Sequence, residues 1–253
     1  MKIGLIGYGR FGRLAAGYLS KEAEVCVYDV RSLAREHLPR NLSRVTLEEA
    51  AGCPVVLLAV PVSALRTTLR KISPHVRARS LIVDVGAVKE LPARWMRTEL
   101  PRGVSLLATH PLFGPDSAGR SLRGRWMVLC PVRISRSRLA SVRRQLHRKG
   151  VRTVVMSVRG HDRLAAETVL LTQYIGRLVL KAGLRRWPEV TRAYGGVLTL
   201  LDIARRDSGD LFRDMVTYSR EGRRVMQSLR RASDGIARAL EGSRGKSRGN
   251  RLR

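Results

Sequence analysis

The first part of the chain alternates short apolar runs with longer segments in which apolar residues recur at helical spacing. Seven runs are rich in Val, Ile and Leu, as expected for strands covered on both faces. They are Lys2–Gly7, Glu24–Asp29, Pro54–Val60, Ser80–Val85, Val104–Thr109, Arg125–Cys130 and Arg152–Ser157. The helix-like segments between them include Gly12–Ser20, Val62–Ile72, Val88–Leu100 and Ser137–Lys149. This alternation predicts an α/β fold, with a Rossmann-type, doubly wound and mostly parallel sheet over residues 1–157.

The pattern changes after His161. From there to Leu240 no strand-like run occurs, and apolar residues recur three or four positions apart. This spacing predicts an all-helical domain over residues 158–240. Because so small a helical unit cannot bury all of its apolar faces within one chain, we expect a homodimer formed through it. Residues 241–253 are rich in Gly, Ser and Arg, which predicts a basic disordered tail.

The charge balance is strongly basic, with 49 Lys and Arg against 20 Asp and Glu and a net charge of +29. The basic residues are spread from Arg10 to Arg253 without interleaved aromatic residues or a recognisable nucleic-acid motif. We therefore expect solvated faces and anionic small ligands rather than a nucleic-acid partner. The longest apolar run, Cys53–Leu65, is shorter than the about 20 residues that span a membrane, so no membrane span is expected.

The cysteines, Cys26, Cys53 and Cys130, are odd in number and far apart. Their spacing predicts neither a disulfide framework nor a metal site, and it favours the reducing cytoplasm.

A glycine-rich sequence follows the first predicted strand and opens a helix. Gly7-Tyr8-Gly9-Arg10-Phe11-Gly12 has the GxGxxG spacing, and Asp29 ends the second strand 20 residues after Gly9. In a dinucleotide-binding loop the first glycine permits the turn, the second lets the pyrophosphate approach, and the third lets the helix pack on the strand. The alternative is an ordinary strand–turn–helix connection, but the order of elements and the acidic residue favour a nucleotide site.

The cofactor preference depends on two neighbouring residues. A carboxylate at Asp29 accepts hydrogen bonds from the ribose hydroxyls and repels a 2′-phosphate, which predicts NAD. Arg31 lies two residues further on and would instead hold the 2′-phosphate of NADP, so NADP is the alternative. Further strand ends are expected beside the cofactor, where the sheet changes direction. These predicted contacts are Ala59, Val60, Pro61, Asp84 and Gly86.

One histidine stands at a predicted strand end. His110 begins the sequence His110-Pro111-Leu112-Phe113-Gly114-Pro115, directly after an apolar strand. A histidine there accepts a proton near neutral pH, which makes it the candidate catalytic base. A lone histidine is more often structural, but its position sets His110 apart from the histidines in polar helical segments.

Several motifs together are similar to one family. The GxGxxG loop, Asp84-Val85-Gly86-Ala87-Val88-Lys89, the His110–Pro115 sequence and Gly160-His161-Asp162 resemble the prephenate/arogenate dehydrogenases of tyrosine biosynthesis over about residues 1–230. The resemblance implies NAD(P)-dependent oxidative decarboxylation of prephenate to 4-hydroxyphenylpyruvate, or of arogenate to tyrosine. Hydride leaves C4 of the ring, His110 takes the hydroxyl proton, and the ring carboxylate leaves as CO2.

The resemblance also implies a substrate site, with departures from the family pattern. Many members have serine where Ala87 stands, and a histidine of the helical half is replaced by Gln173. No arginine aligns with the one that some members use for the ring carboxylate, and Asp202 falls near that place. The candidate substrate-binding residues are Ala87, Lys89, His110, Gln173, Arg177 and Arg192. Arg177 is preferred for the carboxylate because it shares a helix face with Gln173.

Two other readings remain open. One is a different small two-domain NAD(P)-dependent reductase, and the other is a non-catalytic dinucleotide-sensing or nucleic-acid-associated protein on the same fold. Reduction of NAD in the presence of prephenate or arogenate separates these readings from the dehydrogenase.

Overall fold

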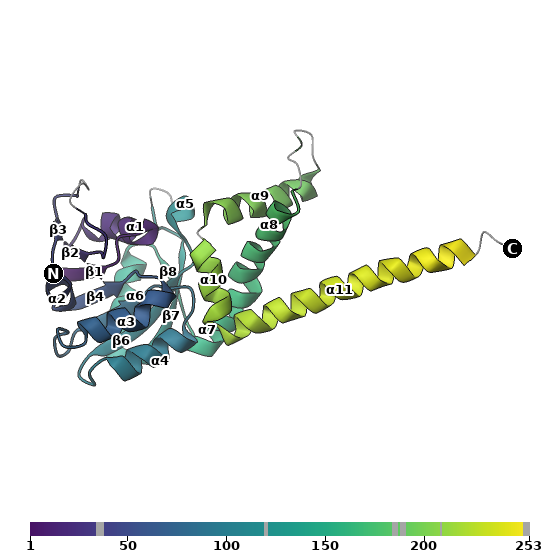
Figure 1. Cartoon of the computed structure of the whole chain (residues 1–253). Coiled ribbons are helices and arrows are strands. Elements are labelled where there is room, and N and C mark those ends of the chain that lie inside the picture. The colour runs from purple at the N-terminus through teal and green to yellow at the C-terminus, as the bar shows by residue number, and fades with distance from the viewer. Residues whose placement is uncertain (34–37, 119–120, 184–186, 188–190, 208, 250–253) are drawn as a thin grey trace. The chain divides into compact units, whose positions relative to one another are not determined.

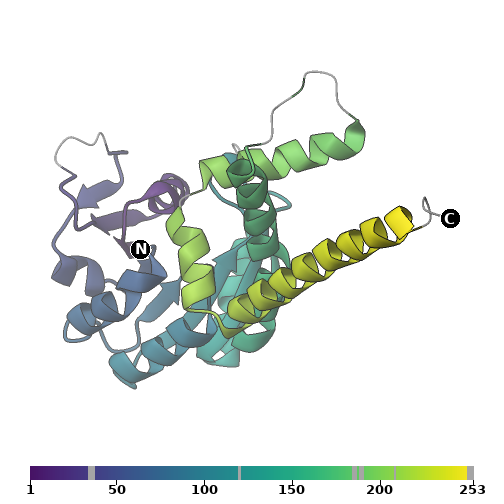
Figure 2. The same cartoon turned by 45° about the vertical axis from the view of Figure 1, so that its right-hand side comes forward.

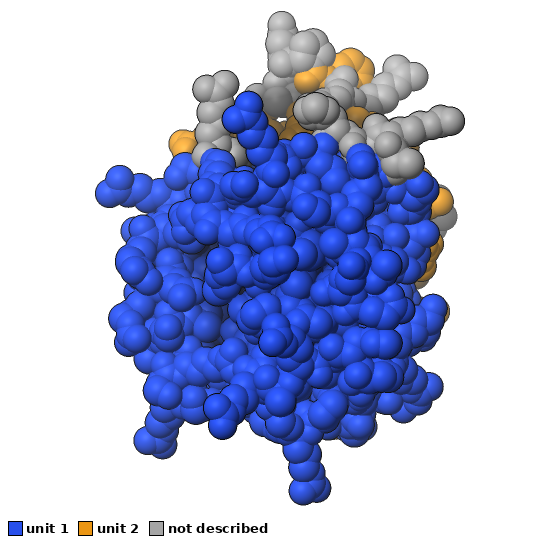
Figure 3. All heavy atoms as spheres, turned by 90° about the vertical axis from the view of Figure 1, so that its left-hand side faces the viewer, with its two compact units in different colours: residues 1–162 blue, residues 163–253 orange. Residues whose placement is uncertain are grey.

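The chain folds into two compact units, residues 1–162 and 163–253 (Figure 3). The computed structural model describes residues 1–33, 38–118, 121–183, 187, 191–207 and 209–249, with the backbone alone over 242–249. The observed boundary lies inside helix α7 (Val158–Ala165), whereas the predicted one lies just before this helix. The difference arises because His161 and Asp162, in the first turns of α7, hydrogen-bond to residues of the first unit.

The first unit is built on one sheet. Among the described residues eight strands pair in the order β3-β2-β1-β4-β5-β6-β7-β8. Their bounds are β1 Lys2–Ile6, β2 Glu24–Tyr28, β3 Leu42–Arg44, β4 Val55–Leu58, β5 Leu81–Asp84, β6 Ser105–Pro111, β7 Trp126–Arg133 and β8 Arg152–Val155. All neighbouring pairs are parallel except β6 with β7. The predicted mostly parallel sheet is therefore confirmed.

β6 continues two residues beyond its predicted end, to Pro111, and β3 and β7 differ more from the sequence expectation. β3 was not predicted, because it has three residues of which Leu42 alone is buried, too few to show a pattern. β7 continues three residues beyond the predicted end at Cys130. It passes Pro131 where the register with β6 shifts. A proline has no N–H to donate, and such an irregularity accommodates it.

Helices cover both faces of this sheet (Figures 1 and 2). They are α1 Arg10–Leu19, α2 Leu47–Ala51, α3 Val62–Ile72, α4 Glu90–Glu99, α5 Pro115–Ala118 and α6 Arg136–Arg148. Successive strand residues point to opposite faces, so Ile6 packs with α2, α3 and α4 while Leu5 packs with α1. On that second face Leu129 packs with α6. The sheet is thus doubly wound, and this is why its strands read as continuous apolar runs.

The strand order places the candidate site. β1 has β2 on one side and β4 on the other, so the winding reverses between β1 and β4. In open α/β sheets, ligands bind outside the carboxyl ends of the strands at this reversal. Gly7 follows β1 at this place, and Ala59 follows β4, with the Ala59 N–H donating to the Ile6 carbonyl.

The described part of the second unit is helical. It comprises the end of α7, a π-helical segment η1 (Ala166–Leu170), α8 (Leu171–Lys181), α9 (Arg192–Arg206), α10 (Gly209–Thr217) and α11 (Arg220–Gly249). α8 and α9 pack so closely that a Cβ on Gly176 would lie 2.2 Å from the Leu200 carbonyl oxygen. Among the described residues, none of the helices is both long and apolar enough to cross a membrane.

The end of the chain differs from the prediction. α11 continues as helix to Gly249, through most of the segment predicted to be disordered, while residues 250–253 lie outside the described part. No proline interrupts this segment, and each glycine costs about 1 kcal/mol in a helix that has already nucleated. Composition alone therefore misjudged residues 241–249.

Candidate active site

The glycine loop has the geometry that a dinucleotide requires. Gly7 has φ 101°, and a Cβ there would lie 2.5 Å from the Ala59 carbonyl oxygen. A Cβ on Gly12 would lie 2.1 Å from the Gly7 carbonyl oxygen, so both positions require glycine. At Gly9, by contrast, an added Cβ meets nothing within 4 Å. The loop is thus packed closely against neighbouring backbone at Gly7 and Gly12, and it is open at Gly9, where a pyrophosphate would approach.

The helix after this loop presents its backbone donors. Gly9 is the N-cap of α1, no side chain caps the helix, and its first turn has no acidic residue. The first N–H groups of α1 and the positive end of the helix dipole therefore suit an anionic group. Arg10, on the first turn, is exposed and donates to both oxygens of Asp116 at 2.7 and 2.9 Å. Tyr8 is buried, with the Arg13 guanidinium 4.9 Å from its ring centre, and Phe11 is half-buried.

Asp29, the predicted ribose contact, lies directly after β2. One carboxylate oxygen accepts from the Tyr8 N–H at 2.6 Å, which ties it to the glycine loop. The other accepts from the backbone N–H and Nε of Arg31 at 2.9 and 3.1 Å. Burial alone would raise the pKa of Asp29, but these hydrogen bonds outweigh it and hold the pKa below its ordinary value. Asp29 is therefore an anion in contact with Arg31, the alternative selector.

The end of β4 lines the same reversal point. Ala59 and Val60 are half-buried, and Pro61 is the exposed N-cap of α3. The close approach of Gly7 to Ala59 brings two of the predicted contact segments together.

The end of β5 carries a buried ion pair. Asp84 and Lys89 are 1% and 0% exposed, and the Lys89 Nζ is paired with Asp84 Oδ2. The other Asp84 oxygen accepts from the Gly86 N–H at 3.0 Å. Both residues are thus engaged within the protein, and the structure gives neither an open path to a ligand. Ala87 is also buried and offers only a methyl group.

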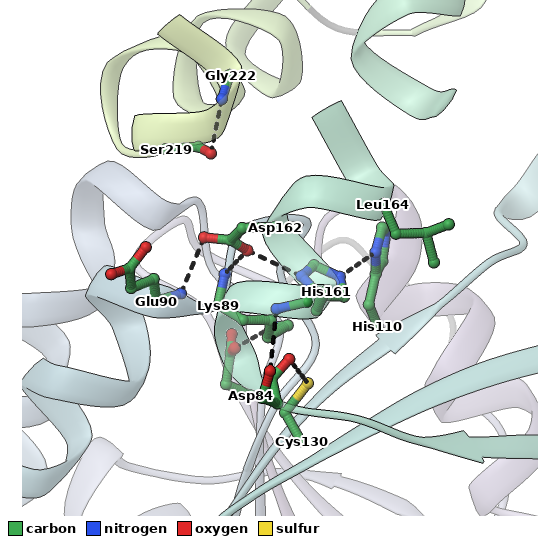
Figure 4. A network of polar contacts seen from close by, with 12 residues as sticks. Asp84, Lys89, Glu90, His110, Cys130, His161, Asp162, Leu164, Ser219 and Gly222 are labelled. Atoms are coloured by element: carbon green, nitrogen blue, oxygen red, sulfur yellow. Dashed lines mark hydrogen bonds and ion pairs between the residues drawn. The ribbon is translucent and has the colours of Figure 1, made fainter. Parts of the chain in front are cut away.

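His110 lies at the end of β6 and contacts a second histidine. Its Nδ1 is 2.8 Å from Nε2 of His161, and the two rings meet edge to face, 5.0 Å apart between centres (Figure 4). His110 is 8% exposed and His161 is fully buried. Thr109, the residue before His110, donates its hydroxyl to the Asp84 carbonyl at 2.9 Å.

Asp162 completes this row of side chains. Its Oδ1 lies 2.8 Å from Nδ1 of His161 and accepts from the Lys89 N–H at 2.7 Å. Its Oδ2 accepts from the Glu90 N–H at 3.0 Å. The carboxyl group of Asp162 therefore caps the N-terminus of α4, although it lies more than seventy residues later in the chain. It also forms a hydrogen bond with His161.

Both histidines have pKa values below the ordinary value of 6.5, which favours their neutral form at neutral pH. Burial lowers the pKa of His110 well below 6.5, and the neighbouring His161 and the Lys89 cation lower it further. Burial also lowers the pKa of His161, against the opposing effect of its hydrogen bond to Asp162. A neutral imidazole at neutral pH has a lone pair, which a general base requires.

The second unit holds a separate polar cluster. Gln173 on α8 is 1% exposed, and its Nε2 donates to Asp207 Oδ2. Arg177, one turn later, donates to the Asp207 carbonyl at 3.4 Å, and its guanidinium lies 5.2 Å from the centre of the Phe212 ring. Gln173 and Arg177 therefore share one helix face, as their spacing predicts. Arg192 lies elsewhere, exposed at the first position of α9.

Sequence reasoning missed the contact of the His161–Asp162 pair with His110. The motif Gly160-His161-Asp162 was noted only as part of the resemblance, because nothing in a linear sequence connects His161 with a strand end 51 positions earlier. The available signal was the Gly160-His161-Asp162 motif itself, which places a second histidine next to a carboxylate.

Comparisons with known proteins agree with this geometry. The family model described as prephenate dehydrogenase, nucleotide-binding domain, matches residues 22–155, more than half of the chain. Arogenate dehydrogenase 2, chloroplastic, of Arabidopsis thaliana is 28% identical over 252 residues, which cover 96% of this chain and 70% of that protein. Arogenate dehydrogenase 1, chloroplastic, of the same plant is 29% identical over 95% of this chain but only 39% of its own length.

Solved structures share the fold over nearly the whole chain. The prephenate dehydrogenase from A. aeolicus in complex with hydroxyphenyl propionate and NAD+ has a TM-score of 0.72 at 19% identity, covering 95% of this chain and 92% of that one. Synechocystis arogenate dehydrogenase has a TM-score of 0.67 at 20% identity, covering 96% and 93%. These matches show the shared fold, and the family model, which matches more than half of the chain, shows that the chain belongs to the prephenate dehydrogenase family.

Proposed function

We propose that this protein is an NAD(P)-dependent dehydrogenase that oxidatively decarboxylates prephenate or arogenate in tyrosine biosynthesis. The observation that carries the proposal is His110, a neutral base at a strand end of the family's nucleotide-binding domain, on the same sheet edge as the glycine loop. The relatives support it, because two of them are named arogenate dehydrogenases.

The glycine loop fits a nicotinamide dinucleotide, which would supply the hydride acceptor when bound. The open space at Gly9 and the uncapped start of α1 suit the pyrophosphate. Asp29 suits the ribose hydroxyls, which favours NAD. The Arg31 guanidinium is paired with the Asp29 carboxylate. This exposed side chain would have to rotate away from Asp29 to contact the 2′-phosphate of NADP. Arg10, Ala59, Val60 and Pro61 remain proposed neighbours of the cofactor.

His110 would take the proton of the ring hydroxyl. With the bound cofactor supplying the hydride acceptor for C4, Nε2 of His110 would accept the hydroxyl proton and C4 would become a carbonyl. The C1 carboxylate then leaves as CO2, its bonding electron pair makes the ring aromatic, and the phenolic oxygen takes a proton back. Because aromatisation drives the second step, the protein has mainly to position the substrate and move one proton.

The substrate carboxylates need positive partners. We propose Arg177 as the first, because arginine matches a carboxylate with two parallel hydrogen bonds, and Arg192 as the second. Gln173 would contact the side chain of the substrate through its amide. Lys89 contributes through its charge rather than by contact, since it is buried and paired with Asp84.

A rate measurement tests the proposal directly. NADH or NADPH formation is followed at 340 nm with prephenate and with arogenate, each at several concentrations, together with CO2 release. The expected result is reduced cofactor and CO2 in equal amounts with at least one of the substrates. Failure of both substrates with both cofactors, in a protein that binds NAD, would overturn the proposed activity.

We also propose a homodimer formed through the second unit, in the cytoplasm. Among the described residues, exposed large apolar side chains are denser there than in the longer first unit. They are Leu164, Leu178, Leu180, Trp187, Ile203, Ile236 and Leu240. Light scattering should give twice the chain mass of 28.2 kDa at micromolar concentration, and the mass of one chain would refute the dimer.

A further inference from the structure

The partners of His161 determine which of its nitrogens carries hydrogen. The Asp162 carboxyl group already accepts two backbone N–H bonds, one on each oxygen. An ionised carboxylate only accepts hydrogen bonds, and both oxygens of Asp162 already accept from the N-terminus of α4. The third contact, from His161 Nδ1 at 2.8 Å, must therefore be an N–H donor. A neutral His161 then has a bare Nε2.

The bare nitrogen of His161 fixes His110 in turn. His161 Nε2 accepts, so His110 Nδ1, at 2.8 Å, must donate. A neutral His110 that carries hydrogen on Nδ1 has its lone pair on Nε2, the nitrogen that faces away from His161. The lowered pKa values of both rings agree with this assignment, because each is neutral when the protein is at rest.

We propose that Asp162 and His161 act as a positioning pair that holds His110 in the one tautomer able to take a proton at Nε2. The inference rests on the proposed function, in which His110 is the base. It gives His110 a hydrogen-bond partner in His161 and gives His161 one in Asp162. Ala87 supplies no such partner, since a methyl group neither donates nor accepts a hydrogen bond.

The same row of side chains, His110, His161 and Asp162, stabilises the imidazolium that forms when His110 accepts the proton. When His110 becomes an imidazolium, its Nδ1–H donates to His161 and His161 Nδ1–H donates to the Asp162 anion, so the new positive charge is linked to a negative one. The other charged groups close to the pair, Lys89 and Asp84, form a buried ion pair of their own. The Lys89 cation lowers the pKa of both rings, so its charge favours return of the proton after the chemical step.

The first test is spectroscopic and needs no turnover. Imidazole ¹⁵N chemical shifts of the full-length protein distinguish a protonated from a bare ring nitrogen. At pH 8, His110 is expected to be protonated on Nδ1 and bare on Nε2, and His161 likewise. In Asp162→Asn, the side-chain amide can donate to His161 Nδ1, which would reverse both tautomers. A wild-type His110 that carries its hydrogen on Nε2 would overturn the proposal, even if the enzyme proves active.

The second test is kinetic. His161→Leu removes the acceptor and should lower kcat by roughly 10–150-fold, the value of one hydrogen bond to a group that becomes charged. His161→Gln keeps an acceptor oxygen and should recover part of this loss, while the KM for NAD changes little in both. Asp162→Asn should cost roughly 10²–10⁴-fold through the wrong tautomer. His75→Leu, an exposed histidine after α3, is the matched control and should match the wild type.

The outcomes separate the two proposals. A His161→Leu variant that folds, binds NAD and keeps kcat within twofold of wild type would refute the positioning pair while leaving the dehydrogenase intact. A wild-type protein with the expected tautomers but no turnover of either substrate would refute the proposed function instead. Circular dichroism and NAD binding establish in each case that the variant is folded.

Discussion

Both units contain a buried polar cluster, and the two clusters differ in completeness. In the first unit Asp84, Lys89, His161 and Asp162 satisfy one another and the backbone around them. In the second unit Gln173 is equally buried, but its Oε1 has no hydrogen-bond partner among the described residues. An unmet buried acceptor costs about 1–3 kcal/mol, and a ligand that donates to it would recover that cost. We therefore propose that the first cluster serves the chemical step and that the second binds the substrate.

This contrast makes a kinetic prediction. Changes in the first cluster should act on kcat, and changes in the second on the KM of the substrate. The predictions below test this division.

The largest expected effect is at His110. His110→Asn removes the base and should lower kcat by roughly 10²–10⁴-fold, the usual contribution of a positioned acid–base group. The affinity for NAD, measured by calorimetry, should stay within about twofold because no cofactor contact is assigned to the ring. A variant that loses NAD affinity and rate together would mark His110 as structural and remove the contrast between the clusters.

Arg177→Ala tests the second cluster. Losing one charge-assisted pair costs about 1.5–3 kcal/mol, or roughly 10–150-fold in kcat/KM, and should appear as a higher KM for the substrate and not for NAD. Arg177→Lys should recover only part of it, since lysine cannot bind in the bidentate way. Arg205→Ala, exposed in the last turn of α9, serves as the control. A substrate KM within about twofold of wild type would transfer the role to Arg192.

Two glycines of one loop should separate binding from stability. Gly9→Ala places its Cβ in open space at an allowed φ of −71°, so the fold should persist while the affinity for NAD falls about tenfold or more. Gly12→Ala forces a contact with the Gly7 carbonyl and should cost about 1–3 kcal/mol of unfolding free energy. Urea unfolding and NAD titration measure both. Equal NAD affinity in Gly9→Ala and wild type would contradict a cofactor at this loop.

The cofactor preference should respond to Asp29. Asp29→Ser removes the negative charge opposite a 2′-phosphate and leaves Arg31 free of its carboxylate, so kcat/KM should shift toward NADP by about tenfold. Arg31→Ser is the opposite test and should weaken NADP without weakening NAD. A wild type that already prefers NADP would identify Arg31 as the selector.

The last prediction concerns stability as a function of pH. His110 and His161 have lowered pKa values in the folded chain, so below about 6.5 the unfolded chain binds more protons. Their contribution to stability is complete above that value and is lost as pH falls toward the lowered pKa values, by up to about 1.4 kcal/mol per pH unit for each ring. Urea unfolding at pH 7, 6 and 5 should show this slope in wild type and in His75→Gln. A weaker slope is expected in His110→Asn, and an unchanged one would mean that His110 titrates normally.

The sequence alone determined the frame of the first unit. Seven strands and the four longer helices between them, α1, α3, α4 and α6, followed from apolar periodicity. Strands covered on both faces must be apolar throughout, so they are visible as apolar runs. The glycine loop and His110 could be found for a related reason: residues at the carboxyl ends of parallel strands share one edge whatever the details of packing. β3 could not be found, because three residues with one buried side chain hold too little pattern. The helical end of α11, residues 241–249, could not be found either. Its composition is typical of disorder, and composition does not show that a helix formed earlier in the chain continues into this segment.

Only the tertiary structure decided which polar groups meet. The sequence left Lys89 as a contact for the substrate, and folding instead buried it against Asp84 because both residues follow the same strand into the interior. His161 and Asp162 lie in a helix, yet the fold brings them to the end of β6 and the start of α4. Hydrophobic patterning is local and repeats along the chain, so it can be read from the sequence. A hydrogen bond between side chains depends on angstrom-scale distances between segments far apart in the chain, and only the packed fold sets those distances.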